Sequence, residues 1–210
     1  MTAGLAVFEI NVAKQIVLCI QNFSSKDHTE PLHRFDTNLI VVGGTGIAAA
    51  LPYILAHLEA DRKSERKTLK IHLVWSIRQR QMFYRIFTNE LAAILQHQDI
   101  TTSVYCTKLD ITPREFDSDD CVLSKNCAPE VMSTRVGSPA SNGSLRFMPG
   151  RPNIHELIMS EMGEARNSSS SIGVLTCGPA QMADQYRDAV YEAMKHGFHE
   201  IDYYEEAFGW

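Results

Sequence analysis

The sequence predicts an α/β fold: a doubly wound domain built on a mostly parallel, five-stranded sheet. Short apolar, β-branched runs alternate along the chain with segments of helical periodicity, which is typical of strands joined by crossover helices. One such run, 38–43, passes directly into a glycine turn and then a helical pattern. Parallel strands need helices on both faces of their sheet, and right-handed crossovers make the sheet doubly wound. Ligands are therefore expected at the carboxyl ends of the strands.

Each element follows from its local pattern of residues. The first strand, 39–43, is an unbroken apolar run, and the second, 69–77, is rich in apolar and β-branched residues. Further strands are expected at 100–106, 172–176 and 200–204, and helices at 46–60, 81–96, 153–164 and 181–195. A charged loop, 61–68, and a serine-rich loop, 168–171, connect some of these elements.

Length and composition indicate one main domain. A chain of 210 residues with 44% hydrophobic content can bury a full core. We expect an N-terminal segment of uncertain structure, 1–36, followed by the α/β domain over 37–210. An irregular insertion, 107–144, interrupts this domain, because Asp, Ser, Pro and Asn replace the periodic apolar pattern there. The net charge of −5, without any run of Lys or Arg, argues against a nucleic-acid partner.

Membrane spans, disulfides and metal sites are not predicted. The chain has no stretch of the roughly 18 apolar residues that crossing a bilayer needs, and its N-terminus lacks the basic start of a signal peptide. Its five cysteines are odd in number and scattered, which favours reduced thiols. Cys121 and Cys127 lie close together, but no second pair at metal-ligand spacing accompanies them.

The glycine turn after the first strand is the most informative motif. Residues 44–49 read G-x-G-x-x-A, in which small residues allow a tight turn, a close approach of the backbone to a pyrophosphate, and close packing of helix on strand. The helix that follows would direct free N–H groups at the phosphates. The alternative is a tight connection with a purely structural role.

Two arginines are expected near the carboxyl edge of the sheet, one at the end of a strand and one just before a helix. Arg78 ends the second strand, where a fold selective for NAD usually carries an acid, and its guanidinium would favour the 2′-phosphate of NADPH. Arg151 stands just before a helix and could join the same phosphate site. Each could equally be a solvated surface residue, with Pro152 and Asn153 starting the helix after Arg151.

A third strand-to-helix connection occurs at 176–180. Gly178 leaves room for a flat ligand, and Pro179 suits the first turn of a helix, because its missing N–H has no partner to lose there. Cys177 would lie at the edge of the sheet. Taken alone, this cysteine is better interpreted as a buried structural thiol.

Together these motifs carry a family resemblance. In order they are Gly43-Gly44-Thr45-Gly46-Ile47, Trp75-Ser76-Ile77-Arg78, Gly150-Arg151-Pro152, Cys177-Gly178-Pro179 and the terminal Tyr204-Glu205-Glu206-Ala207-Phe208-Gly209-Trp210. The chain from about residue 34 to 210 resembles the nicotinamide-binding domain of the ferric-chelate reductase and NADPH oxidase family, whose soluble half is similar to ferredoxin–NADP reductase. The ending resembles the ferric reductase branch most closely.

The resemblance implies roles for individual residues. It implies that pyrophosphate is held at Gly44, Thr45 and Gly46, with Gly43 and Ile47 in the same motif, and the 2′-phosphate at Arg78 and Arg151. Cys177 and Gly178 would line the nicotinamide pocket, with Pro179 in the same cofactor-binding turn and with Glu206 and Phe208 near the reacting ring. Trp210 would cover the flavin until nicotinamide displaces it, one stacking partner replacing another.

The implied activity is hydride transfer from NADPH to FAD, with electrons then passing through haem to Fe(III). In the family, a flavin-binding barrel and haem-bearing membrane helices precede this domain, which lies on the cytosolic face. The 38 residues before the first strand are too few for a barrel, so we expect the isolated chain to bind nucleotide without turnover. The alternatives are a non-catalytic nucleotide-binding module left by loss of the flavin domain, and a self-contained NAD(P)-dependent oxidoreductase. Iron, copper and dioxygen all remain open as final acceptors.

Overall fold

The computed structural model describes residues 30–63, 68–86, 94–95, 97–108 and 144–207. The expected insertion, apart from its ends, and the residues before 30 lie outside this part of the chain, as do Phe208 and Trp210. The strands are β1 (Thr37–Gly43), β2 (Lys70–Ile77), β3 (Ile100–Cys106), β4 (Ser144–Pro149), β5 (Ile172–Gly178) and β6 (Ile201–Ala207). The helices are α2 (Glu30–His33), the 3-10 turn η1 (Gly44–Gly46), α3 (Ile47–Arg62), α4 (Arg80–Ile86), α6 (Ile154–Ser168) and α7 (Ala180–Lys195).

The described strands form one parallel sheet in the order β4-β3-β2-β1-β5-β6. This confirms the predicted doubly wound α/β class, but the sheet has six strands and not five. The strand that was not predicted is β4, which pairs with β3 from Thr101↔Ser144 to Cys106↔Pro149. Its side chains alternate between partly buried and exposed, as expected at a sheet edge, so it lacks the unbroken apolar run that marks the central strands.

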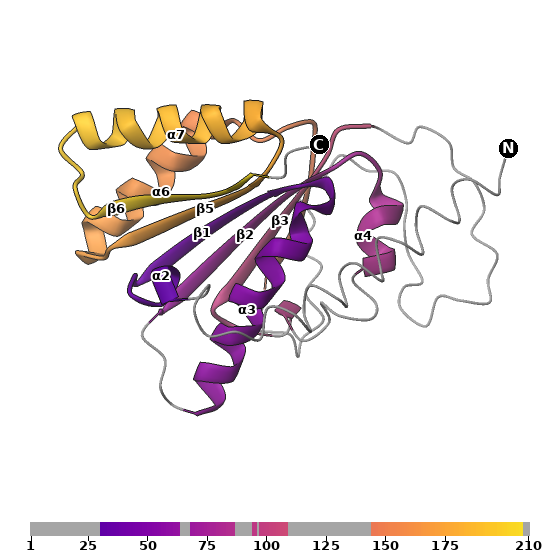
Figure 1. Ribbon diagram of the computed structural model, residues 1–210, viewed down its shortest axis with the longest axis horizontal. Coiled ribbons are helices and arrows are strands. Elements are labelled where there is room, and N and C mark those ends of the chain that lie inside the picture. The colour runs from indigo at the N-terminus through magenta and orange to yellow at the C-terminus, as the bar shows by residue number, and fades with distance from the viewer. Residues whose placement is uncertain (1–29, 64–67, 87–93, 96, 109–143, 208–210) are drawn as a thin grey trace, which may run out of the picture.

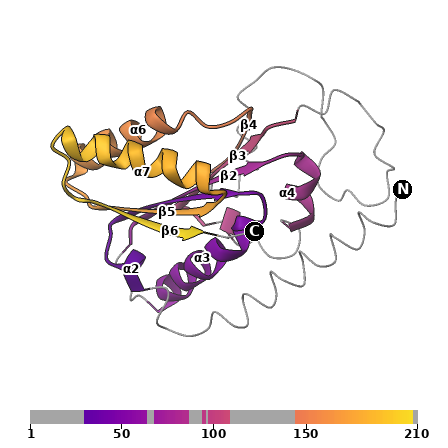
Figure 2. The ribbon, with the colours of Figure 1, turned by 45° about the horizontal axis from the view of Figure 1, so that its top comes forward.

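Helices cover both faces of the sheet (Figures 1 and 2). On one face α3 and α4 contribute to a core that includes Ile54, Trp75 and Phe83. On the other face α6 and α7 pack over a second core that includes Ile158, Val174 and Tyr186. No helix in the described part of the chain has both the length and the apolar character that crossing a bilayer requires.

The order of the strands reverses at β1. From β1 the chain passes through α3 to β2 on one side, while on the other side β1 pairs with β5, which the chain reaches from α6 on the opposite face. Such a reversal leaves a crevice outside the carboxyl ends of the two central strands. The ends of β1 and β5 are therefore where a ligand is expected in a fold of this kind.

The opposite edge is held by contacts at the start of β1. The Asp36 carboxylate accepts hydrogen bonds from the backbone N–H (2.9 Å) and the hydroxyl (2.8 Å) of Ser171. These two bonds lower the pKa of Asp36, the backbone bond most. The Asp36 carbonyl also accepts from the N–H of Leu69. One residue thus aligns the starts of β1, β2 and β5.

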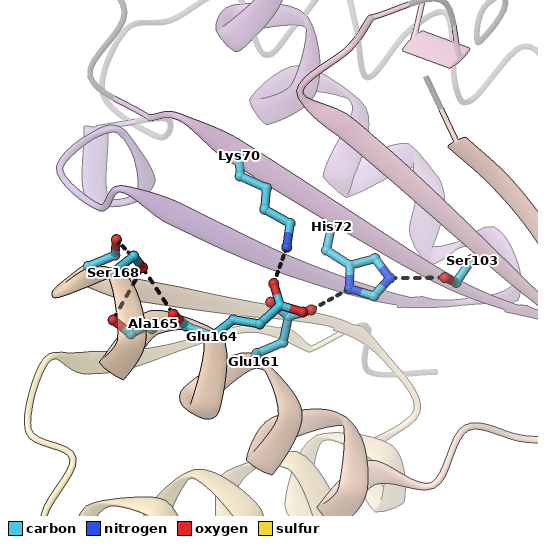
Figure 3. Close-up of polar contacts among 8 residues, drawn as sticks. Lys70, His72, Ser103, Glu161, Glu164, Ala165 and Ser168 are labelled. Carbon is cyan, nitrogen blue, oxygen red and sulfur yellow. Dashed lines mark hydrogen bonds and ion pairs between the residues drawn. The ribbon is translucent and has the colours of Figure 1, made fainter. Parts of the chain in front are cut away.

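A buried polar network fastens α6 to the sheet (Figure 3). His72 on β2 lies between two partners: its Nδ1 is 2.6 Å from Glu161 Oε1, and its Nε2 is 2.9 Å from Ser103 Oγ. Burial alone would raise the pKa of Glu161, but the hydrogen bond and charge of His72, together with the charge of Lys70, lower it overall. Ser103 is only 7% exposed, so its hydroxyl is a structural partner and not an accessible nucleophile.

Candidate functional site

The glycine turn lies at the carboxyl end of β1, where the chain turns through η1 into α3. Gly44 has a positive φ of 54°, which glycine adopts without strain. A Cβ at Gly46 would lie 2.3 Å from the carbonyl oxygen of Cys177, so the start of α3 is seated directly on β5. These two positions need glycine for different reasons, one for its conformation and one for its size.

The start of the helix supplies no capping or acidic side chain of its own. Neither η1 nor α3 has a side-chain cap at its N-terminus, and neither has an acidic residue in its first turn. The turn also has space beside it, since a Cβ at Gly44 would meet no atom of the described residues within 4 Å. An anion at this position would meet backbone N–H groups and the positive end of the helix dipole.

Trp75 anchors the turn from the neighbouring strand. Its indole N–H donates to the carbonyl of Gly44 at 2.9 Å, and its side chain is fully buried. Sequence reasoning included Trp75 in a motif but gave it no role. The signal for such a role is its place in the sequence, two residues before the predicted end of the second strand. A tryptophan buried there needs an acceptor for its indole N–H.

The ends of β5 and β6 lie beside the turn. Cys177 and Gly178 are the last two residues of β5. Pro179 is the N-cap of α7 and so lies just before the first helical turn, in which the sequence placed it. Cys177 pairs in register with Val42 on one side and with Glu206 on the other. A Cβ at Gly178 would lie 3.3 Å from the Gly43 nitrogen. The predicted residues of β1, β5 and β6 therefore meet at one edge.

Glu206 is the charged group of this cluster. The Tyr53 hydroxyl, from the second turn of α3, donates to Glu206 Oε1 at 3.2 Å. Burial, and then the negative charge of Glu206, raises the pKa of the Cys177 thiol well above its usual range, and the same two causes raise the pKa of Tyr53. Both groups are therefore protonated near neutral pH. The cluster can hydrogen-bond and orient a ligand, but its thiol is not a ready nucleophile.

The two predicted phosphate-binding arginines lie further along the same edge. Arg78 directly follows β2, whereas Arg151 follows β4, with β3 between these strands. Both residues are exposed, and among the described residues neither side chain takes part in a salt bridge. Gly150, with φ +79°, turns the chain after β4 and donates its N–H to the Cys106 carbonyl. The structure therefore brings both arginines to the carboxyl edge, at the ends of two strands that β3 separates.

Taken together, a doubly wound parallel sheet and a glycine turn at its switch point define a nucleotide-binding domain of the dinucleotide type. Residues 35–191 match the family model described as the ferric reductase NAD binding domain, and the chain belongs to this family. The match confirms the resemblance inferred from the motifs.

Similar proteins are components of fungal metal reductases. The chain is 28% identical over 180 residues to a "Probable ferric reductase transmembrane component" of Candida albicans. This alignment covers 82% of this chain and 25% of that protein. It is also 28% identical to "Ferric/cupric reductase transmembrane component 1" of the same organism, covering 82% and 22%. It is 22% identical to "Ferric/cupric reductase transmembrane component 2" of Saccharomyces cerevisiae, covering 87% and 26%. The chain thus spans about a quarter of the length of these relatives.

Proposed function

We propose that this chain binds NADPH at the carboxyl edge of its sheet and is the hydride-donor domain of a ferric-chelate reductase type flavoenzyme. The single observation that carries the proposal is the glycine turn at the switch point. There Gly44 adopts a positive φ beside open space, and Gly46 packs on the carbonyl of Cys177. This arrangement leaves backbone N–H groups for a pyrophosphate at the start of a helix that no side chain caps.

The remaining assignments extend along the edge from that turn. Arg78 and Arg151, both exposed, would take the adenosine 2′-phosphate, because a guanidinium pairs with phosphate through two parallel hydrogen bonds. Cys177, Gly178 and Pro179 would line the nicotinamide end, where the thiol of Cys177 is buried. Glu206 would lie next to the reacting ring, held in place by the Tyr53 hydroxyl.

NADPH, when bound, supplies a hydride at its nicotinamide ring. In this chain no side chain need act as a general acid or base, since the described residues would bind, orient and exclude water. The flavin that would accept the hydride, and the haem groups that would carry electrons to Fe(III), belong to the complete family protein, in which this domain would lie on the cytosolic face of a membrane. Phe208 and Trp210, outside the described residues, would complete the flavin side of the site.

Cofactor preference tests the proposal directly. Calorimetric titration should show that NADPH binds more tightly than NADH, and that the preference falls by about tenfold or more in Arg78→Ala, Arg151→Ala or the double variant, because a hydrogen bond to a charged group contributes roughly 1.5–3 kcal/mol. Arg62→Ala is the matched control, an exposed arginine at the far end of α3. Equal affinity of the wild type for NADPH and NADH would reject the assignment.

Turnover tests the assignment of a hydride-donor domain. The purified chain should bind NADPH yet fail to reduce a ferric chelate, and reduction should appear only when an FAD domain of the family is supplied. A chain that reduces the chelate unaided would instead be a self-contained oxidoreductase. A chain that binds NADPH but supports no reduction with the FAD domain would be a non-catalytic nucleotide-binding module.

A further inference from the structure

A cluster of two histidines and one carboxylate lies at the amino edge of the sheet, opposite the glycine turn. His57 is on the third turn of α3, while His97 and Asp99 directly precede β3. One ligand atom from each residue can be chosen so that all three lie within 4.8 Å of one another. The two imidazole rings meet edge to face with centroids 5.7 Å apart, and His97 Nδ1 lies 3.7 Å from Asp99 Oδ2.

A second carboxylate orients His97. Asp61 Oδ2 lies 3.1 Å from His97 Nε2, and a neutral His97 would donate its Nε2 proton to this oxygen. The lone pair of Nδ1 then faces the Asp99 carboxylate, and Nδ1 is a buried atom without a hydrogen bond. In this tautomer His97 Nδ1 and the Asp99 carboxylate both present lone pairs to the same position, so the two can bind one metal ion there.

We propose that His57, His97 and Asp99 bind a divalent transition-metal ion of the zinc class, with Asp61 as the residue that positions His97. Imidazole nitrogen with one carboxylate oxygen is a set that Zn²⁺ accepts and that Mg²⁺ and Ca²⁺ do not prefer. A carboxylate behind a ligating histidine is the usual support of such sites, because it fixes the tautomer and the orientation of the ring.

The dimensions of the cluster suit this class of ion. Metal–ligand distances of about 2.0–2.1 Å in a tetrahedron place ligand atoms roughly 3.3 Å apart, close to the 3.7 Å between His97 Nδ1 and Asp99 Oδ2. His57 is only 2% exposed and forms the inner wall. The side chains of His97 and Asp99 are 18% and 20% exposed, which leaves a path for the ion and a position for a water ligand.

A bound ion would join the C-terminal half of α3 to the chain entering β3. Its first effect would be on stability, because an ion that binds only the folded chain raises the unfolding temperature by mass action. The cluster lies at the edge opposite the glycine turn, so the inference is independent of the proposed function. Nucleotide affinity should not depend on the ion.

The test uses the full chain stripped of metal with EDTA and then titrated with ZnCl₂. We expect saturation at one ion per chain and a rise in unfolding temperature, with His97→Gln and Asp99→Asn each weakening zinc binding at least tenfold. Asp61→Asn should weaken it by about 10–100-fold, as loss of an outer-shell partner does. Co²⁺ offers a second readout, since its visible absorption should appear in the wild type and disappear in His97→Gln.

Two control variants distinguish this site from other histidines and cysteines that could bind zinc. His155→Gln removes an exposed histidine on α6, and Cys121→Ser with Cys127→Ser removes the two cysteines that are close in sequence; neither change should alter binding. Each variant must keep the wild-type far-UV circular dichroism in EDTA. Unchanged zinc affinity in both Asp61→Asn and His97→Gln would mean an adventitious ion only and would overturn the proposal. So would a wild type that zinc does not stabilise.

Discussion

The hydroxyl of Tyr53 donates to the carboxylate of Glu206 across 3.2 Å, and this bond joins the second turn of α3 to the carboxyl end of β6. Glu206 also lies opposite Cys177 in the sheet register. One hydrogen bond therefore holds the carboxylate whose charge raises the pKa of the Cys177 thiol, and it does so from the helix that starts at the glycine turn.

Replacing Tyr53 by Phe tests what this bond does. We expect the unfolding free energy to fall by about 1–3 kcal/mol, since a hydrogen bond to a charged group is lost. Affinity for NADPH should change while affinity for its 2′,5′-ADP fragment does not, because Glu206 lies at the nicotinamide end. Urea denaturation and calorimetry measure the two effects. Tyr191→Phe, on an exposed residue of α7, is the matched control, and equal losses for both ligands would contradict the placement.

Two glycine substitutions should have opposite effects. Gly46→Ala places a Cβ against the Cys177 carbonyl, which cannot rotate away, so we expect a loss of about 1–3 kcal/mol and loss of nucleotide binding. Gly163→Ala places a Cβ in open space within α6, where alanine should stabilise the chain by about 0.5–1 kcal/mol. Thermal unfolding of both variants measures the contrast. A stable Gly46→Ala chain that still binds NADPH would show that the turn can move away from β5.

Trp75→Phe removes the indole N–H but keeps an aromatic ring. The carbonyl of Gly44 then loses its partner, which costs about 1–3 kcal/mol, and the turn should lose nucleotide affinity as well. Phe83→Leu provides the comparison, because Phe83 packs near Trp75 in the same core and donates no hydrogen bond to the turn. It should reduce stability with little effect on NADPH affinity. Similar affinity losses in both variants would show that core volume, and not the hydrogen bond, shapes the turn.

The thiol of Cys177 should react slowly with alkylating reagents. Burial raises its pKa, and the charge of Glu206 raises it further, so little thiolate forms and little of that is accessible. Mass spectrometry of the peptide containing Cys177, after iodoacetamide treatment at pH 8, should show far slower labelling in the native chain than in urea. Comparable rates in both conditions would place Cys177 in an open pocket.

Glu161 and Glu164 form a matched pair for pH dependence (Figure 3). The pKa of Glu161 is lowered in the folded chain, so its ion contributes stability above the unfolded pKa of about 4.5, and this contribution is lost as the pH falls through the lower folded value. Glu161→Gln should cost about 1–3 kcal/mol at pH 7 and less as the pH falls below 4.5. Glu164→Gln, in an exposed pair with Lys70, should cost about 0–1 kcal/mol. Urea titrations at several pH values measure both, and a Glu161→Gln cost that grows below pH 4.5 would contradict this sign.

The central strands were predictable because both of their faces are buried. Every residue of β5 is buried, so the sequence there is a continuous apolar run whose meaning does not depend on its neighbours. β4 is only partly buried and lies at the edge of the sheet. There, apolar and polar residues alternate over six positions beside an irregular segment, which is a weak signal for a strand. The strand count was therefore wrong by one, while the class of fold was right.

The candidate site was predictable where a residue acts through its own backbone. Gly44 and Gly46 need glycine because of local conformation and close packing, and small residues in a turn indicate both. Tyr53 and Trp75 act through partners in other elements, and Tyr53 is 153 positions from Glu206. No local pattern carries such information, since the sheet alone decides which residues meet. For the same reason, the sequence did not predict that His57 and His97 lie together.

The central position of β1 has a consequence for the order in which the protein folds. β1 can pair with β2 across a short stretch of chain, but its pairing with β5 closes a loop in which Asp36 and Ser171 are 135 residues apart. Closing so long a loop costs entropy before its contacts repay it. The seat of Gly46 on Cys177 forms only at that late step. During refolding, the chain should therefore gain nucleotide affinity when the sheet is completed, after its helices have formed. The cofactor would then report the last folding event.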